Sequence, residues 1–134
     1  MLVAHSYIAE DAYVGKQITD MLNHMGVCVI PAEILRRDRA AKAGSELSPT
    51  LPWICNRELA GAVWEYKDII DGIILMSAFP CGPDSMVNDI IIRRIKGIPT
   101  LNLTVDAQDA TAGLETRLES FVDILHFREG ERVI

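Results

Sequence analysis

Cys81 stands where an apolar run, Gly72 to Phe79, meets a stretch of helical periodicity that begins near Met86. In open α/β sheets, ligands bind at this edge because the strand carboxyl ends and the helix amides converge there. Unpaired N–H groups at a helix start favour a thiolate, whereas the nearby Asp84 carboxylate opposes it. Cys81 is therefore the leading candidate for chemistry. The alternative is a small residue that only closes a turn.

His5 and Tyr7 are expected at the end of the first strand, facing the loop of residues 80–85 across a crevice. A histidine there could orient a ligand or donate a proton, and the alternative is a hydrogen-bonded structural histidine. Gly82 and Ser85, next to Cys81, are expected to line the same crevice. These residues together form the predicted binding site.

Other polar and thiol residues have simpler interpretations. Asp84 or Ser85 is predicted to cap the helix that follows Cys81, and Asn56 to cap an earlier helix. Cys28 and Cys55 are interpreted as core or near-core residues.

Four strand-like runs alternate with helical patterns, which indicates βαβ units and a parallel sheet. Strands are expected at 2–7, 27–30, 72–79 and 98–105, and helices after each of them, at about 12–25, 56–67, 84–96 and 112–125. Right-handed crossovers favour the strand order 2-1-3-4. We therefore predict a single α/β domain over residues 1–134, small and three-layered, Rossmann-like or flavodoxin-like, with a four-stranded parallel sheet.

Residues 32–53 form the least regular part of the chain, with a short helix expected only at 36–43. Leu47, Leu51, Pro52 and Trp53 are expected to add exposed apolar character. Long irregular segments in small domains are often functional or docked on another molecule. We expect this segment to be a docking surface, and a homodimer formed through it is left open.

Composition excludes several classes of function. A net charge of −6 argues against nucleic-acid binding, which needs clustered Lys and Arg. Three scattered cysteines argue against a disulfide scaffold, and the apolar stretches are too short for a membrane span. No GxGxxG or GxxxxGK[ST] motif occurs. A cytoplasmic protein with reduced thiols is expected.

Two segments carry a resemblance to a known family. They are residues 79–88 (FPCGPDSMVN) and residues 113–121 (GLETRLESF). With 91–94 (IIRR), 99–103 (PTLNL) and 56–59 (NREL), the chain resembles a domain of the acyl-CoA dehydratase activase-related proteins, akin to the D-component of 2-hydroxyglutaryl-CoA dehydratase. Members of that family are much longer. The resemblance therefore implies a domain excised from, or part of, a longer multidomain protein.

The resemblance also implies an iron–sulfur system for anaerobic metabolism. An ATPase activator module with an Hsp70/actin-type fold passes an electron to a partner that holds a [4Fe–4S] cluster. Cys81 matches one ligand of that cluster, with Gly82, Ser85, His5 and Tyr7 around it. Since a cluster needs about four thiolates or substitutes, other domains of the parent protein would supply the rest, and the isolated domain is expected to hold no stable cluster and to be inactive.

Two alternatives remain. Residues 81–84 (CGPD) differ in one residue from the CGPC of thioredoxins, but Asp84 replaces the resolving cysteine, so only a monothiol redox module is left. The domain could instead be purely structural, with Cys81 closing a turn and residues 47–53 binding a partner subunit.

Overall fold

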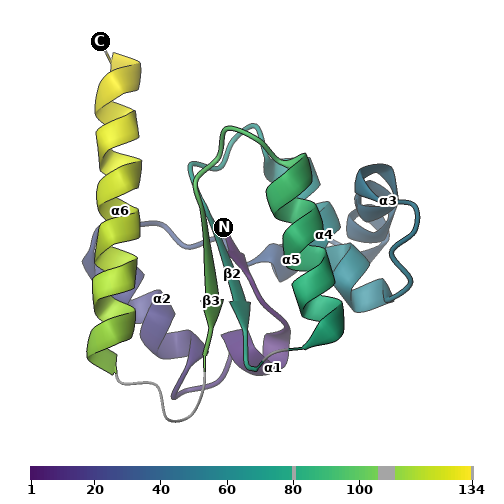
Figure 1. Ribbon diagram of the computed structural model, residues 1–134, viewed down its shortest axis with the longest axis horizontal. Coiled ribbons are helices and arrows are strands. Elements are labelled where there is room, and N and C mark those ends of the chain that lie inside the picture. The colour runs from purple at the N-terminus through teal and green to yellow at the C-terminus, as the bar shows by residue number, and fades with distance from the viewer. Residues whose placement is uncertain (80, 106–110, 134) are drawn as a thin grey trace.

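A short parallel sheet lies at the centre of the computed structural model, which describes residues 1–79, 81–105 and 111–133. Its strands are β1 (Leu2–Val3), β2 (Ile73–Ser77) and β3 (Thr100–Thr104), in the order β1-β2-β3. Every residue of β2 is buried, as its apolar run up to Ser77 predicts for a strand covered on both faces. The fold is therefore mixed α/β around a three-stranded parallel sheet (Figure 1).

The prediction of a four-stranded sheet is not met within these described residues. The backbone N–H of Leu2 donates to the carbonyl of Ile30 at 2.8 Å, and Leu2 and Pro31 form one isolated parallel bridge, but 27–30 is not a strand. Pro31 has no N–H to extend a ladder, and β1 is only two residues long. β1 ends early because the chain turns at His5, whose carbonyl accepts hydrogen bonds from Ile8 and Ala9.

The helices of the described chain are α1 (Ser6–Ala9), α2 (Gly15–His24), the 3-10 turn η1 (Ala32–Ile34), α3 (Arg37–Leu47), α4 (Ile54–Tyr66), α5 (Gly82–Arg94) and α6 (Thr111–Val133). None of them is long and apolar enough to cross a membrane. α4 begins two residues before the expected cap, and α6 continues well beyond residue 125, where it extends past the sheet (Figure 1).

Two apolar cores lie on opposite faces of the sheet. Leu75 and Ile73 pack with α3, α4 and α5, whereas Ile74 and Met76 pack with α1, α2 and α6. Alternate residues of β2 thus point to opposite layers, as the two-residue period of a strand requires. The result is a three-layer arrangement of helix, sheet and helix (Figure 1).

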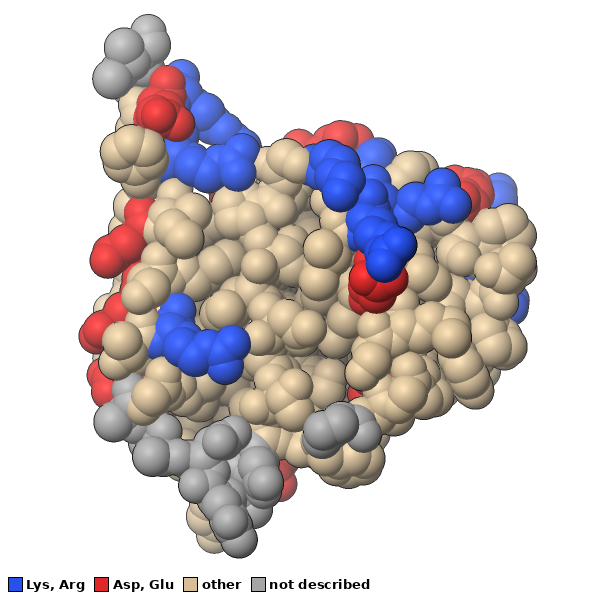
Figure 2. All heavy atoms as spheres, viewed as in Figure 1, with Lys and Arg blue, Asp and Glu red and all other residues tan. Residues whose placement is uncertain are grey.

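Two arginines of α6 join this helix to the sheet. Arg117 donates to the carbonyl of Asn102 in β3 at 2.8 Å, and Arg128 donates to the carbonyl of Gly97 at 2.7 Å. Basic side chains accordingly lie at the margins of the face in Figure 2, over α5 and α6, and leave an uncharged area between them. These contacts fix α6 alongside the open side of β3.

The prediction for residues 32–53 is wrong in its main point. α3 is a helix of 11 residues, and Leu47 and Leu51 are buried at 3% and 1% exposure. The glycine that seemed to break the helix, Gly44, instead allows α3 to approach α4: a Cβ on it would lie 2.1 Å from the carbonyl oxygen of Arg57. Leu47 and Leu51 thus belong to the core, whereas Pro52 and Trp53 are exposed as expected, Trp53 at 39%.

Candidate functional site

Cys81 occupies the N-cap position of α5, with extended backbone at φ −112° and ψ 128°. Its carbonyl accepts the first helical hydrogen bond, from the N–H of Ser85 at 2.9 Å, while its side chain makes no capping bond and is partly exposed. The prediction that Asp84 or Ser85 caps this helix is therefore wrong, because the helix starts two residues earlier, with Pro83 in its first turn. Pro80, part of the expected crevice loop, lies outside the described residues.

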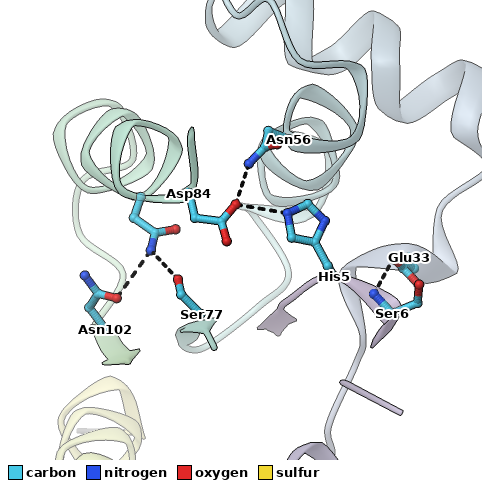
Figure 3. Close-up of polar contacts among 8 residues, drawn as sticks. His5, Ser6, Glu33, Asn56, Ser77, Asp84 and Asn102 are labelled. Carbon is cyan, nitrogen blue, oxygen red and sulfur yellow. Dashed lines mark hydrogen bonds and ion pairs between the residues drawn. The ribbon is translucent and has the colours of Figure 1, made fainter. Parts of the chain in front are cut away.

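Asp84 turns into the molecule and is only 8% exposed. One of its oxygens, Oδ1, lies 3.0 Å from Nε2 of His5 and 2.8 Å from Nδ2 of Asn56 (Figure 3). An ionised carboxylate only accepts hydrogen bonds, so Nε2 of His5 donates, as does the amide of Asn56. Three segments, the start of α1 and the first turns of α4 and α5, thus meet at one carboxylate.

The position of Asp84 suits a hydrogen-bond acceptor. It lies in the first turn of α5, where the helix dipole stabilises a negative charge. Hydrogen bonds to a charged group contribute about 1.5–3 kcal/mol each when they are shielded from water. The His5 and Asp84 side chains are 18% and 10% exposed, so this network holds the His5 ring in one orientation.

Tyr7 stacks on His5, with ring centroids 5.6 Å apart and an interplanar angle of 8°. Burial of part of the phenol raises the pKa of Tyr7, and the negative charges of Asp84 and Cys81 raise it further. Tyr7 nevertheless keeps 63% of its surface exposed. The structure thus brings Cys81, His5 and Tyr7 to the same edge of the sheet.

A second polar contact lies beside the first. Nδ2 of Asn88 donates to Oγ of Ser77 at 3.4 Å and to Oδ1 of Asn102 at 3.3 Å (Figure 3). Asn88 is on α5, one turn after Asp84, while Ser77 and Asn102 are on β2 and β3. These bonds hold α5 over the carboxyl end of the sheet and so fix the position of Cys81.

Gly82 and Ser85 lie next to Cys81 but outside the polar network of Asp84. Ser85 is exposed, and its side chain makes no hydrogen bond with the residues the structure describes. A Cβ added to Gly82 would meet nothing within 4 Å, so no steric contact requires glycine there. Both residues lie beside Cys81 without joining the His5–Asp84–Asn56 network.

Cys28 and Cys55 were expected in or near the core, and that prediction is wrong, since both are exposed. Cys55 lines a cavity of about 630 Å³ together with His5 and Tyr7. Cys28 lines another, of about 240 Å³, near Leu22 and the C-terminal part of α6. The two thiols therefore lie in different environments.

The donor groups do not by themselves suit a complete metal centre. Among the described residues, no group of three or more His, Cys, Asp and Glu could hold a metal ion. Cys81 offers one thiolate, and Asp84 is already engaged by His5 and Asn56. A four-ligand cluster at this edge would need ligands from outside these residues.

Comparison of the chain with protein-family models, with curated proteins and with solved structures found no match. The geometry of the site therefore carries the functional reasoning.

Sequence reasoning missed the roles of Asp84, Asn56 and Asn88, although a signal was present. Residues 84, 87, 88 and 91 lie on one helical face, and so do 56, 59, 60 and 63. Every residue of both sets is buried. A polar side chain within such an apolar stripe indicates a buried hydrogen-bonded group, because unpaired burial is costly.

Proposed function

We propose that this domain supplies one thiolate ligand, Cys81, to an iron–sulfur cluster whose other ligands come from further domains of a longer protein. The observation that carries the proposal is the partly exposed Cys81 at the N-terminus of a 13-residue helix, with a fixed polar network directly behind it. A helix N-terminus favours the thiolate, which is the ligand form of cysteine. The resemblance to the acyl-CoA dehydratase activase-related proteins suggests a [4Fe–4S] cluster.

The surroundings of Cys81 favour a ligand that is covered by another domain. Tyr7, Phe79 and Met86 are large side chains with 63%, 60% and 50% of their surface exposed. Phe79 and Met86 lie within a few residues of Cys81, and Tyr7 is near enough for the Cys81 charge to affect it. Exposed apolar side chains around one reactive group are typical of a surface that docks against a partner.

His5 has a positioning role in this proposal. Asp84, itself held by Asn56, accepts a hydrogen bond from its ring, and Tyr7 stacks on it, so the wall beside Cys81 is rigid. The partner that the resemblance suggests is an ATPase of Hsp70/actin-type fold. It would act on the assembled protein.

The finer fold assignment belongs to the same proposal. We infer a Rossmann-like or flavodoxin-like domain in which the segment 27–30 acts as an outer strand next to β1. The sheet then runs 27–30, β1, β2, β3, which is the expected order 2-1-3-4 of the four strands counted along the chain. The hydrogen bond from Leu2 to Ile30 and the parallel bridge from Leu2 to Pro31 support this assignment.

The test is anaerobic iron–sulfur reconstitution of the full natural protein with Cys81→Ser, Cys81→Ala and, as the matched control, Cys28→Ser. We expect both Cys81 variants to lose iron, sulfide and visible absorbance, because they remove a ligand. Cys28→Ser should keep all three, because Cys28 lines the other cavity.

A full cluster in Cys81→Ala would exclude Cys81 as a ligand. Equal losses in Cys28→Ser would show that the assay reports general damage. If Cys81→Ala changes neither cluster content, folding nor association, Cys81 only closes a turn.

A further inference from the structure

The cavity of about 630 Å³ lies between α1, η1 and the first turns of α3 and α4. Its volume is within the range of small-molecule sites, about 300–1,000 Å³. Apolar side chains from η1 and its C-cap, Ala32 and Leu35, and from α4, Leu59, form part of the wall and are buried. The cavity is therefore a preformed hollow in which an apolar floor meets several polar and charged side chains.

One side of the cavity is aromatic. Tyr7 stacks on His5, and the hydrogen bond from His5 to Asp84 fixes the orientation of the His5 ring on which Tyr7 rests. Since Tyr7 is 63% exposed, a face or an edge of its ring is open to a ligand. Aromatic rings attract other planar rings and also cations.

The charges of the cavity are unevenly balanced. Nε of Arg37 lies 3.1 Å from both carboxylate oxygens of Glu58, so these two charges compensate each other. Glu33 accepts one hydrogen bond, from the backbone N–H of Ser6 at 3.0 Å, and forms no close ion pair among the described residues, although its charge also acts on Arg37. The cavity thus carries one uncompensated carboxylate.

We propose that this cavity binds a planar aromatic molecule that carries N–H donors or a positive charge. The ring of the ligand stacks against Tyr7, and its N–H group donates to Glu33. Anionic ligands of the same shape are rejected, because the wall holds two carboxylates, Glu33 and Glu58, against one guanidinium, Arg37. This site shares His5 and Tyr7 with the wall beside Cys81, but its ligand makes no use of the Cys81 thiolate, so the proposal does not depend on the ligand role of Cys81.

The probes are benzamidine, which is planar and cationic, and benzoate, its anionic counterpart of nearly the same shape. Each is titrated into the whole protein by calorimetry and by NMR. We expect benzamidine to bind and benzoate not to bind. Tyr7→Ala and Glu33→Gln should each weaken benzamidine binding by about tenfold, while Tyr7→Phe keeps it.

Matched controls are Tyr13→Ala, since Tyr13 is 82% exposed and outside the cavity, and Glu46→Gln, an exposed glutamate of α3 that is also outside it. Both should bind benzamidine as the natural protein does. The exposed thiols give a second readout. Bound benzamidine should slow alkylation of Cys55, which lines this cavity, and leave the rate at Cys28 unchanged.

Equal binding of benzoate, or a tenfold loss in Tyr13→Ala, would overturn the proposal. So would the absence of benzamidine binding at millimolar concentration, or binding that Tyr7→Ala and Glu33→Gln leave unchanged. Circular dichroism melting of each variant separates loss of binding from loss of folding.

Discussion

Replacing Gly61 with alanine should push α3 away from α4 and so destabilise the protein. Gly61 is buried in α4, and a Cβ built on it would lie 1.8 Å from the carbonyl oxygen of Ala40 and 2.6 Å from the nitrogen of Gly44. Both are backbone atoms of α3 and cannot rotate away as a side chain would. The helix itself must therefore move.

The size of the effect follows from this contact. Ordinary contacts begin at 3.4 Å, so the shortfall at Ala40 is about 1.6 Å. Overpacking a tight core costs about 1–3 kcal/mol and occasionally more, while alanine recovers about 1 kcal/mol of helix propensity over glycine. Because the contact involves backbone, we expect a net loss of about 2–3 kcal/mol in the free energy of unfolding, or roughly 10 °C in Tm.

Urea unfolding followed by circular dichroism measures this change. The control is Gly130→Ala, because Gly130 lies within α6 and a Cβ there would meet nothing within 4 Å. That variant should gain up to about 1 kcal/mol from helix propensity alone. Since Ala40 and Cys55 both line the larger cavity, Gly61→Ala should also speed alkylation of Cys55.

Two results would refute this reasoning. A Gly61→Ala protein within about 0.5 kcal/mol of the natural one would show that α3 and α4 are not in close contact there. An equal loss in Gly130→Ala would show that the helix backbone, and not the contact between helices, sets the effect.

Asp84→Ala should lower the free energy of unfolding by about 2–4 kcal/mol, because it leaves His5 and Asn56 without their acceptor. Thermal unfolding measures this loss, and the exposed control Asp89→Ala should lose under about 1 kcal/mol. The pKa of Tyr7 is raised, so the folded protein should lose stability as the pH rises above about 10, where the unfolded phenol ionises first. Cys81→Ser should lower that pKa by removing a negative charge, as phenolate absorbance read against a Tyr7→Phe baseline would show. No change would mean that Cys81 and Tyr7 do not interact.

The central strand and the layers could be read from the sequence, and the irregular segment could not. The run from Ile73 to Met76 is apolar throughout, which is typical of a strand buried on both faces. In α3, by contrast, Gly44 counts locally against a helix, yet it allows α3 to approach the backbone of α4. Propensity describes a residue in isolation, whereas the contact that favours glycine here involves a distant segment.

In the candidate site, the sequence placed two helix starts two residues too late, and this changed the predicted role of two side chains. Asp84 and Asn56 were both predicted to be helix caps, where their side chains would bond to N–H groups of their own helices. Each is in fact the third residue of its helix, α5 or α4, because each helix begins two residues earlier than predicted. From that position each side chain points inward along the apolar stripe, and the two meet. The polar pattern could have marked both residues as buried. Their hydrogen bond to each other could not be predicted, and neither could the bond from His5, 79 positions from Asp84, because both bonds depend on how three segments pack.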